Sequence, residues 1–204
     1  MMMRRCAFAL IAASPLCLAT ARAADAPLMA PTRNVVVVYA VSGGSQQQSA
    51  PKFRVSYGDQ GRVRTDFFRF AETTEPFAWV IYDPTIDRIT TVLPERRGYV
   101  MRDVGNLPSP GSFLHPGMSY TRAGTETVAG VSCTDWQIAA ETPTTTCVTD
   151  DGVVLRATRD KPQPGEIRAT SVQYGALPAD TFKPPADFQF IPSPDFPNIK
   201  PQGQ

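Results

Sequence analysis

Short segments in which apolar and polar residues alternate, separated by turn residues, run through most of this chain. In KFRVSY, residues 52–57, the side chains of Phe53, Val55 and Tyr57 fall on one side and charged or hydroxyl residues on the other. A period of two is typical of a half-buried β-strand. Roughly nine to eleven such segments occur at spacings near 8–12 residues, with no convincing amphipathic helix among them. Because flat open sheets of that size are uncommon, we predict a mainly β fold: a curved antiparallel sheet or half-open β-barrel with little helix.

The first 23 residues have the features of a secretory signal peptide. Arg4 and Arg5 precede an apolar run over residues 6–19, and Ala21-Arg22-Ala23 has the small-x-small pattern that signal peptidase cuts. An uncleaved membrane anchor is an alternative, but the apolar run is short for a membrane-spanning helix. A lipoprotein anchored at Cys17 is another, but Leu16 stands where a small residue is needed. We predict cleavage after Ala23, export to the periplasm and no transmembrane span in the remaining chain.

The remaining chain has the length of one domain and almost no net charge. Cleavage removes three of the 20 Lys and Arg residues and none of the 19 Asp and Glu residues, so residues 24–204 carry a formal charge of −2. This charge balance, without long basic runs, speaks against a nucleic-acid partner. We predict a monomer with one β-rich domain over residues 24–190 and a proline-rich mobile tail over residues 191–204.

Two cysteines remain after cleavage, in the segment AGVSCTDWQIAAETPTTTCVTDDG. An even pair in an exported protein favours a disulfide, so we predict that Cys133 and Cys147 staple a hairpin. If the numbers of paired residues sum to 280, Cys133 faces Cys147 and Trp136 faces Thr144. A redox site would have C-x-x-C spacing, and a zinc site would need about four ligands. The sequence therefore predicts a structural bridge, no metal and no cofactor.

The sequence offers little that points to catalysis. His115 is the single histidine and lies in the proline- and glycine-rich loop 103–118, and no G-x-S-x-G motif occurs. Two carboxylate pairs lie in turn-like segments, where Asp is favoured for local hydrogen bonds: Asp83 with Asp87, and Asp150 with Asp151. We predict no catalytic residue and no enzymatic activity, with a hydrolase as the alternative. Substitution of His115 is predicted to be silent.

Eleven arginines mostly alternate with apolar residues on the expected strands. They favour a solvated outer face whose charges protect exposed strand edges. The alternative is a site for an anionic headgroup at the mouth of a barrel, held by bidentate guanidinium contacts. The eleven are Arg62, Arg64, Arg69, Arg88, Arg96, Arg97, Arg102, Arg122, Arg156, Arg159 and Arg168.

The order of several motifs resembles a known family. The segments are RVRTDFFR, VIYDPTIDRITTVLPERRGYV, ETVAGVSCTDWQI, CVTDDGVVLRATR and YGALPADTFKPPADF. Over about residues 32–190 they resemble a family of exported bacterial proteins that is distantly similar to the periplasmic lipoprotein carriers, the Lol carriers. The resemblance implies a half-open β-barrel with an apolar concave side that a lid caps and that shelters acyl chains. The sequence departs from the carriers because residues 24–42 show no amphipathic helix, and only residues 103–118 could serve as a lid.

We therefore expect an exported, non-catalytic binding protein that shelters an apolar ligand, the acyl chain of a lipid or lipoprotein, in a concave β-sheet. The alternative is a structural or protein-interaction module of the cell envelope, with a filled core and no ligand. No functional residue of the carriers can be matched to a position here. The candidates for lining the ligand site are Phe53, Val55, Tyr57, Phe77, Trp79, Ile81 and Trp136.

Overall fold

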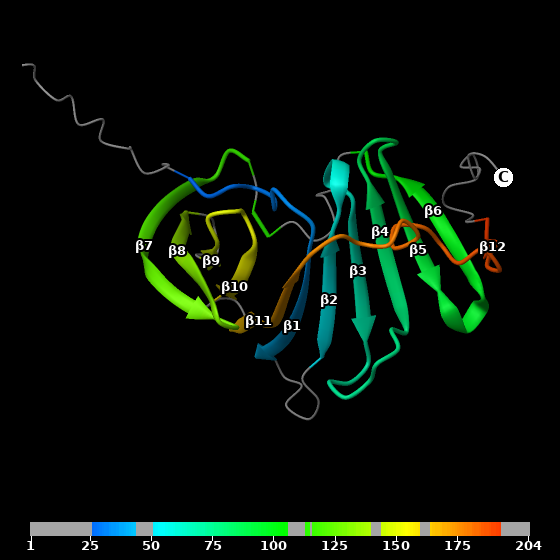
Figure 1. Ribbon diagram of the computed structural model, residues 1–204, viewed down its shortest axis with the longest axis horizontal. Helices are drawn as coiled ribbons and strands as arrows, with labels where there is room; N and C mark the ends of the chain where they lie inside the picture. Colours follow the sequence, from blue (N-terminus) through cyan, green and yellow to red (C-terminus); the bar gives the residue numbers. More distant parts are fainter. Residues whose placement is uncertain are drawn as a thin grey trace, which may run out of the picture.

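The computed structural model describes residues 26–43, 51–105, 113–114, 116–139, 144–159 and 164–192. Within these ranges the chain forms one 12-stranded sheet in the order β12-β6-β5-β4-β3-β2-β1-β11-β10-β9-β8-β7 (Figure 1). The only helices in these ranges are two single 3₁₀ turns, Asp59–Gly61 and Pro94–Arg96. The predicted fold class, a curved antiparallel sheet with little helix, is confirmed.

The strands follow the alternating segments of the sequence. Each β-branched or aromatic run forms one strand, and the Gly, Pro and Asp clusters form the connections. The strands are β1 (Val35–Gly43), β2 (Lys52–Tyr57), β3 (Val63–Phe68), β4 (Ala78–Asp83), β5 (Arg88–Leu93), β6 (Gly98–Asp103), β7 (Ser119–Val128), β8 (Val131–Ala139), β9 (Thr144–Val148), β10 (Val154–Arg159), β11 (Gly165–Tyr174) and β12 (Gln189–Phe190).

Several predictions concern residues outside these ranges. The expected signal peptide, the tail from residue 193 onward, His115 and residues 106–112 of the expected lid all lie outside the described residues. Those predictions stay predictions. Among the helices that the structure describes, none has the length and apolar character needed to cross a membrane.

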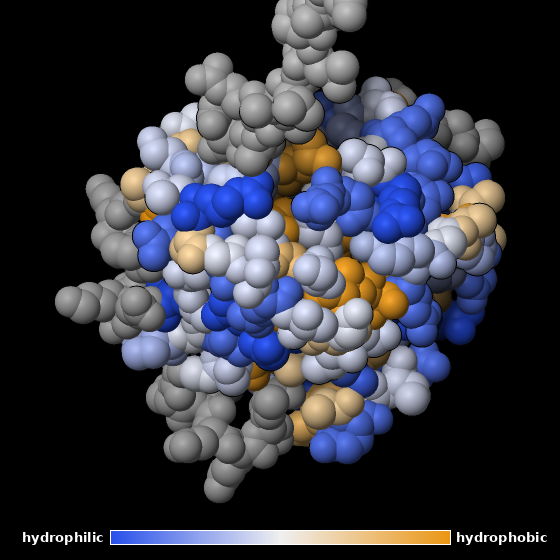
Figure 2. Space-filling model, turned by 60° about the vertical axis from the view of Figure 1, so that its left-hand side comes forward, coloured by the Kyte–Doolittle hydropathy of each residue, from blue (hydrophilic) through white to orange (hydrophobic). Residues whose placement is uncertain are grey.

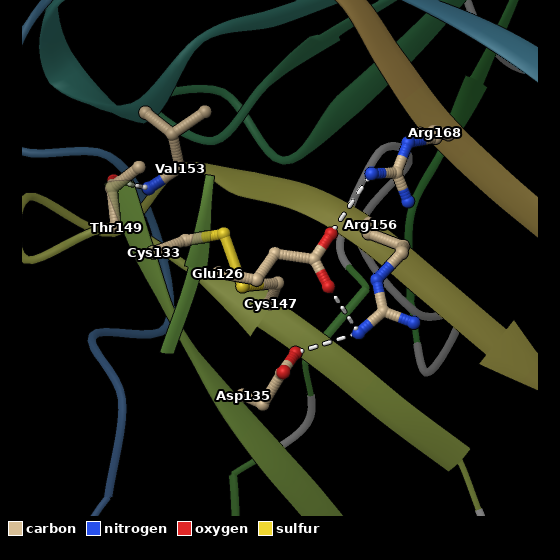
Figure 3. Close-up of a disulfide and its surroundings, with 8 residues drawn as sticks. All are labelled: Glu126, Cys133, Asp135, Cys147, Thr149, Val153, Arg156 and Arg168. Atoms are coloured by element: carbon tan, nitrogen blue, oxygen red, sulfur yellow. Dashed lines mark hydrogen bonds and ion pairs between the residues drawn. A yellow bond between two sulfur atoms is a disulfide. The ribbon is translucent and has the colours of Figure 1, made fainter. Parts of the chain in front are cut away.

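The sheet consists of two antiparallel meanders that meet at its centre. Strands β1–β6 pair in chain order, strands β7–β11 do the same, and β1 pairs with β11. The second meander curls strongly, which is evident from an ion pair of 3.0 Å between Glu126 on β7 and Arg168 on β11. In a flat sheet, strands four places apart would lie about 19 Å from each other. Glu126 also reaches Arg156 on β10 at 2.9 Å, and Asp135 on β8 lies 2.8 Å from the same guanidinium (Figure 3).

The predicted disulfide between Cys133 and Cys147 is confirmed, but the predicted register is wrong. Strands β8 and β9 pair so that Asp135 faces Cys147 and Trp136 faces Thr146, two residues away from the expected partners. The residue that this register places opposite Cys133 is Thr149, which has left the ladder for a turn in which its N–H donates to the Val153 carbonyl. The bridge therefore runs diagonally from β8 to the end of β9, between Cα atoms 5.4 Å apart (Figure 3).

Side chains alternate between two faces of the sheet, which we name the Tyr39 face and the Trp79 face. Tyr39 pairs with Phe53 and Phe53 with Phe67, so these three residues share one face. Phe67 pairs with Ala78, so Trp79, its neighbour in the chain, points to the other face. Both faces carry buried apolar side chains.

Residues 176–192, which we call the strap, cross the Trp79 face of the first meander; they are orange to red in Figure 1. Phe182, Phe188 and Phe190 of the strap pack against the buried cluster that contains Trp79 and Tyr99. Strand β12 at the end of the strap pairs in parallel with β6 and covers part of that edge of the sheet. The strap thus covers the Trp79 face over β4–β6, whereas it does not cover the Tyr39 face.

Candidate functional site

An aromatic cluster fills the middle of the Tyr39 face. The ring of Phe113, from the connection between β6 and β7, lies 5.6 Å from the ring of Tyr39 and 6.4 Å from that of Phe53, while Tyr39 stacks on Phe53 at 4.9 Å. The Tyr39 hydroxyl donates to the Val154 carbonyl at 2.6 Å, which ties β1 to β10. Leu114, the next residue, packs against a second cluster that includes Trp136. Phe113 and Leu114 therefore form a wedge between the two meanders.

On one side of the wedge lies the larger hollow, which we name the Ile167 hollow. Its volume is about 460 Å³, and its apolar wall is formed by Val41, Phe113, Ala157 and Ile167. Small-molecule sites typically have volumes of about 300–1,000 Å³ and mostly apolar walls. Arg159 also lines it. Its size and lining suit part of an acyl chain.

On the other side of Phe113 lies a smaller hollow of about 250 Å³, the Tyr57 hollow. Its lining combines apolar residues, among them Val63 and Leu114, with the polar residues Tyr57 and Arg62. Tyr57 and Tyr39 share a hydrogen bond, and burial raises the pKa of both phenols. Both tyrosines are therefore neutral near pH 7, and Tyr57 brings a polar but uncharged group to an otherwise apolar wall.

Three of the seven candidate lining residues lie together on the Tyr39 face. Phe53 packs in the aromatic cluster, Val55 is fully buried in the same core, and Tyr57 lines the smaller hollow. Phe77, which is 41% exposed, lies directly before β4, beside a separate hollow of about 310 Å³ that Leu93 also lines.

The other three candidates lie elsewhere. Trp79 and Ile81 are buried on the Trp79 face, in the cluster that the strap covers. Trp136 is buried with Leu114 and Val154 in the core of the second meander. The structure therefore does not bring the seven residues together around one site.

None of the four residues that form the apolar wall of the larger hollow was among the candidates from the sequence: Val41, Phe113, Ala157 and Ile167. Phe113 gave no periodic signal because it stands alone in a loop rich in proline and glycine. Ala157 and Ile167 alternate with Arg156 and Arg168 along β10 and β11. The alternation of apolar and charged residues along these two strands therefore shows which side chains face inward. It does not show whether the space that they face is a hollow or a filled core.

The surface around the second meander is mixed in character. Figure 2 shows small apolar patches separated by hydrophilic side chains on the side where β7–β10 come forward. A surface of this kind lacks one broad apolar area of the type that marks a large protein or membrane interface. On this side of the molecule, the hollows are therefore the better candidates for binding an apolar ligand.

The aspartate pairs take part in local contacts. Asp83 accepts hydrogen bonds from the backbone N–H and the hydroxyl of Thr85, as expected for a turn. Asp151 accepts hydrogen bonds from the Thr149 hydroxyl and from Arg33, the latter at 2.7 Å. In the part of the chain that the structure describes, no three His, Cys, Asp or Glu side chains gather in a way that could hold a metal ion.

Asp151 anchors the N-terminal segment beside the Tyr57 hollow. The backbone N–H of Thr32 donates to the Asp151 carbonyl at 3.0 Å, and Met29 and Pro31 of this segment line the hollow. Partial burial raises the pKa of the Asp151 carboxyl, but hydrogen bonds from Thr149, Arg33 and Tyr174 outweigh this effect and hold the pKa below its ordinary value.

This depressed pKa predicts a pH-dependent contribution of Asp151 to stability. Because the folded-state pKa lies below the unfolded-state pKa, the contribution is complete above the unfolded-state value, about 4, and is lost as pH falls through the folded-state value. We expect Asp151→Asn to lower the free energy of unfolding at pH 7 and to have a much smaller effect at pH 3. Urea unfolding at both pH values measures this, and an equal loss at both would contradict it.

Comparison with known proteins identifies the fold. No protein-family model and no curated protein sequence matches the chain. Solved structures do match it, among them an uncharacterized conserved protein from Thermus thermophilus, with a TM-score of 0.55, 11% identity and coverage of 78% of this chain and 90% of that chain. MucB in its complex with MucA from Pseudomonas aeruginosa has a TM-score of 0.52, 13% identity and coverage of 80% of this chain and 59% of that chain.

A LolA superfamily protein from Nitrosomonas europaea also matches, with a TM-score of 0.40, 8% identity and coverage of 74% of this chain and 90% of that chain. The chain spans about three-fifths of the length of MucB. At 11–13% identity, the Thermus thermophilus protein and MucB show that the fold is shared, and the function is argued from the hollows themselves.

Proposed function

We propose that this protein is an exported, non-catalytic binding protein of the periplasm that shelters an apolar ligand, the acyl chain of a lipid or lipoprotein, on the Tyr39 face. The observation that carries the proposal is the Ile167 hollow, with its volume of about 460 Å³ and its wall of Val41, Phe113, Ala157 and Ile167. Each buried methylene group of a ligand contributes about 0.8 kcal/mol. The ligand is held by burial alone and needs no covalent step.

A fluorescent fatty acid tests this proposal. We expect 11-(dansylamino)undecanoate to bind at micromolar concentration and to be displaced by an unlabelled fatty acid. Ala157→Phe places a ring in the hollow, so it should weaken binding at least tenfold, which corresponds to roughly 1.4 kcal/mol. The measurement is a fluorescence titration of the wild type and the variant.

Ala123→Phe is the matched control, because Ala123 lies exposed on β7 and lines none of the hollows described above. This variant should bind the probe as the wild type does. Absence of displaceable binding by the wild type would contradict the function. Unchanged binding by Ala157→Phe would place the ligand elsewhere.

A second candidate function is supported by strand β7. It forms one edge of the sheet, it is ten residues long, and most of its side chains are exposed. Extended peptides bind to such edges by adding a strand, and MucB, which shares the fold, has been solved in complex with another protein, MucA. As a protein-interaction module, this chain would bind its partner equally well with the Ala157→Phe substitution, whereas a sheltering protein would lose its ligand.

A further inference from the structure

The arginines of the described residues fall into two groups. Eight form an ion pair with a carboxylate: Arg33, Arg54, Arg64, Arg69, Arg88, Arg97, Arg156 and Arg168. Five have no carboxylate partner within these residues: Arg62, Arg96, Arg102, Arg122 and Arg159. Four of these five each line a different hollow, one of them a fourth hollow of about 90 Å³ that Trp136 also lines, while none of the eight paired arginines lines any of the four. Acidic residues also line three of these hollows, namely Glu166, Asp150 and Glu95, so the Tyr57 hollow is the one whose described lining combines an arginine with no carboxylate.

Among these four arginines, Arg62 has a side chain that is held by two contacts, a hydrogen bond and a ring contact. Its Nε donates to the Asp59 carbonyl at 3.2 Å, and its guanidinium carbon lies 5.2 Å from the centre of the Phe182 ring of the strap. These contacts orient the guanidinium at the turn between β2 and β3, beside Gly58 and Gly61, which line the same hollow. The two terminal nitrogens have no carboxylate to bind among the described residues.

The Tyr57 hollow behind Arg62 has the capacity for one short apolar chain. Its volume is about 250 Å³. A methylene group and a liquid water molecule occupy similar volumes, about 30 Å³, so the hollow accommodates on the order of eight carbons. Two acyl chains of ordinary lipid length exceed this volume.

We infer that the Tyr57 hollow binds a single-chain carboxylate amphiphile, with the chain between Val63 and Leu114 and the carboxylate on Arg62. This inference rests on the proposed function and adds a second, smaller site on the other side of Phe113, with the chemistry of its headgroup. A guanidinium presents two parallel N–H donors that match the two oxygens of a carboxylate. One guanidinium balances the single charge of a carboxylate, whereas a phosphate monoester carries up to two charges. Tyr57 stays neutral, so it does not repel the anion.

A pair of ligands of equal length tests this assignment without any variant. Octanoate and 1-octanol are titrated into the wild-type protein while the methionine methyl groups are observed by NMR. Met29 lines the hollow and Met101 is buried on the Trp79 face, so the methyl signal of Met29, identified with Met29→Leu, should shift and that of Met101 should not. Octanoate should bind about tenfold more tightly than octanol, as expected for a charge-assisted hydrogen bond.

Two variants locate the preference for the anion. Arg62→Gln should reduce the affinity for octanoate to that for octanol, and Arg62→Lys, which keeps the charge but loses the paired donors, should leave an intermediate ratio. Arg69→Gln removes an equal charge from an exposed arginine that pairs with Glu95, so it should keep the tenfold ratio.

The outcomes separate this inference from the proposed function. Equal affinity of the wild type for the two ligands would overturn the carboxylate site and leave the sheltering function in place. Octanoate that shifts other methyl groups but not that of Met29 would also overturn the site. If neither ligand binds while the dansyl probe does, the inference fails alone, and if the probe fails as well, the proposed function fails with it.

Discussion

Replacing both Cys133 and Cys147 by alanine is expected to lower the free energy of unfolding by about 3 kcal/mol, the value for a closed loop of this size in the chain-entropy account. The two residues are separated by 14 positions, and both are buried in the core that contains Val128 and Leu155. The loss is a large fraction of the stability of a typical domain, about 5–15 kcal/mol. Urea unfolding of the oxidised wild type and of the double variant measures it.

Reduction provides the control for this prediction. With a reducing agent present during unfolding, the wild type should lose most of the same free energy, whereas the double variant, which has no bridge, should not change. A double variant as stable as the oxidised protein would show that the bridge contributes little and that the curl of the second meander depends on other contacts.

The second large effect is expected at Asp66 on β3. Its carboxylate is 1% exposed and accepts hydrogen bonds of 2.7 Å from the Nε atoms of both Arg54 and Arg64. Removing one partner from a buried ion pair costs about 3–5 kcal/mol, because the remaining charge loses its compensation. Both arginines are partly exposed, so we expect a loss near the lower end, about 3 kcal/mol, for Asp66→Asn.

An exposed ion pair serves as the matched control. Glu95 pairs with Arg69 at 2.6 Å, but both side chains are more than half exposed, and such pairs contribute about 0–1 kcal/mol. Glu95→Gln should therefore change the free energy of unfolding by less than about 1 kcal/mol in the same urea titration. Equal effects of the two substitutions would contradict the role assigned to the buried carboxylate.

Arg64 also links Asp66 to the strap, because one of its terminal nitrogens donates to the Thr181 carbonyl at 3.1 Å. Its guanidinium carbon lies 4.5 Å from the centre of a Trp79 ring. Loss of Asp66 should therefore loosen the strap as well as the strand. The measurement is hydrogen exchange of strap amides, such as that of Ile191, which donates to the Tyr99 carbonyl. Exchange of these amides should be faster in Asp66→Asn than in Glu95→Gln.

The strands and the disulfide could be predicted because their signals are local. Alternation in KFRVSY marks β2, and the two cysteines that remain after the expected cleavage are the only ones available to pair. The register of β8 with β9 could not be predicted, because it depends on Thr149 leaving the ladder for a turn. A shift of two residues keeps every side chain on its own face, so the pattern of burial could not reveal it.

The candidate site was harder to predict because both faces of the sheet are covered. Trp79 and Ile81 look like lining residues in the sequence, but the strap covers their face, so the sheet has buried apolar clusters on both sides. Which face a strand residue occupies is clear from alternation, whereas what covers that face depends on Phe182, Phe188 and Phe190, about 100 residues away. The wedge at Phe113 depends in the same way on contacts distant in sequence.

The central pair of strands has a consequence for how the chain acquires its structure. Strands β1 and β11 are joined at positions 132 residues apart, for example where the Thr170 hydroxyl donates to the Val38 carbonyl. Pairings between such remote segments form slowly, since the chain must first lose the entropy of a very long loop. The two halves cannot unite until nearly the whole polypeptide has been synthesised. Such a delay would keep a nascent chain competent for translocation, in agreement with the export that we propose.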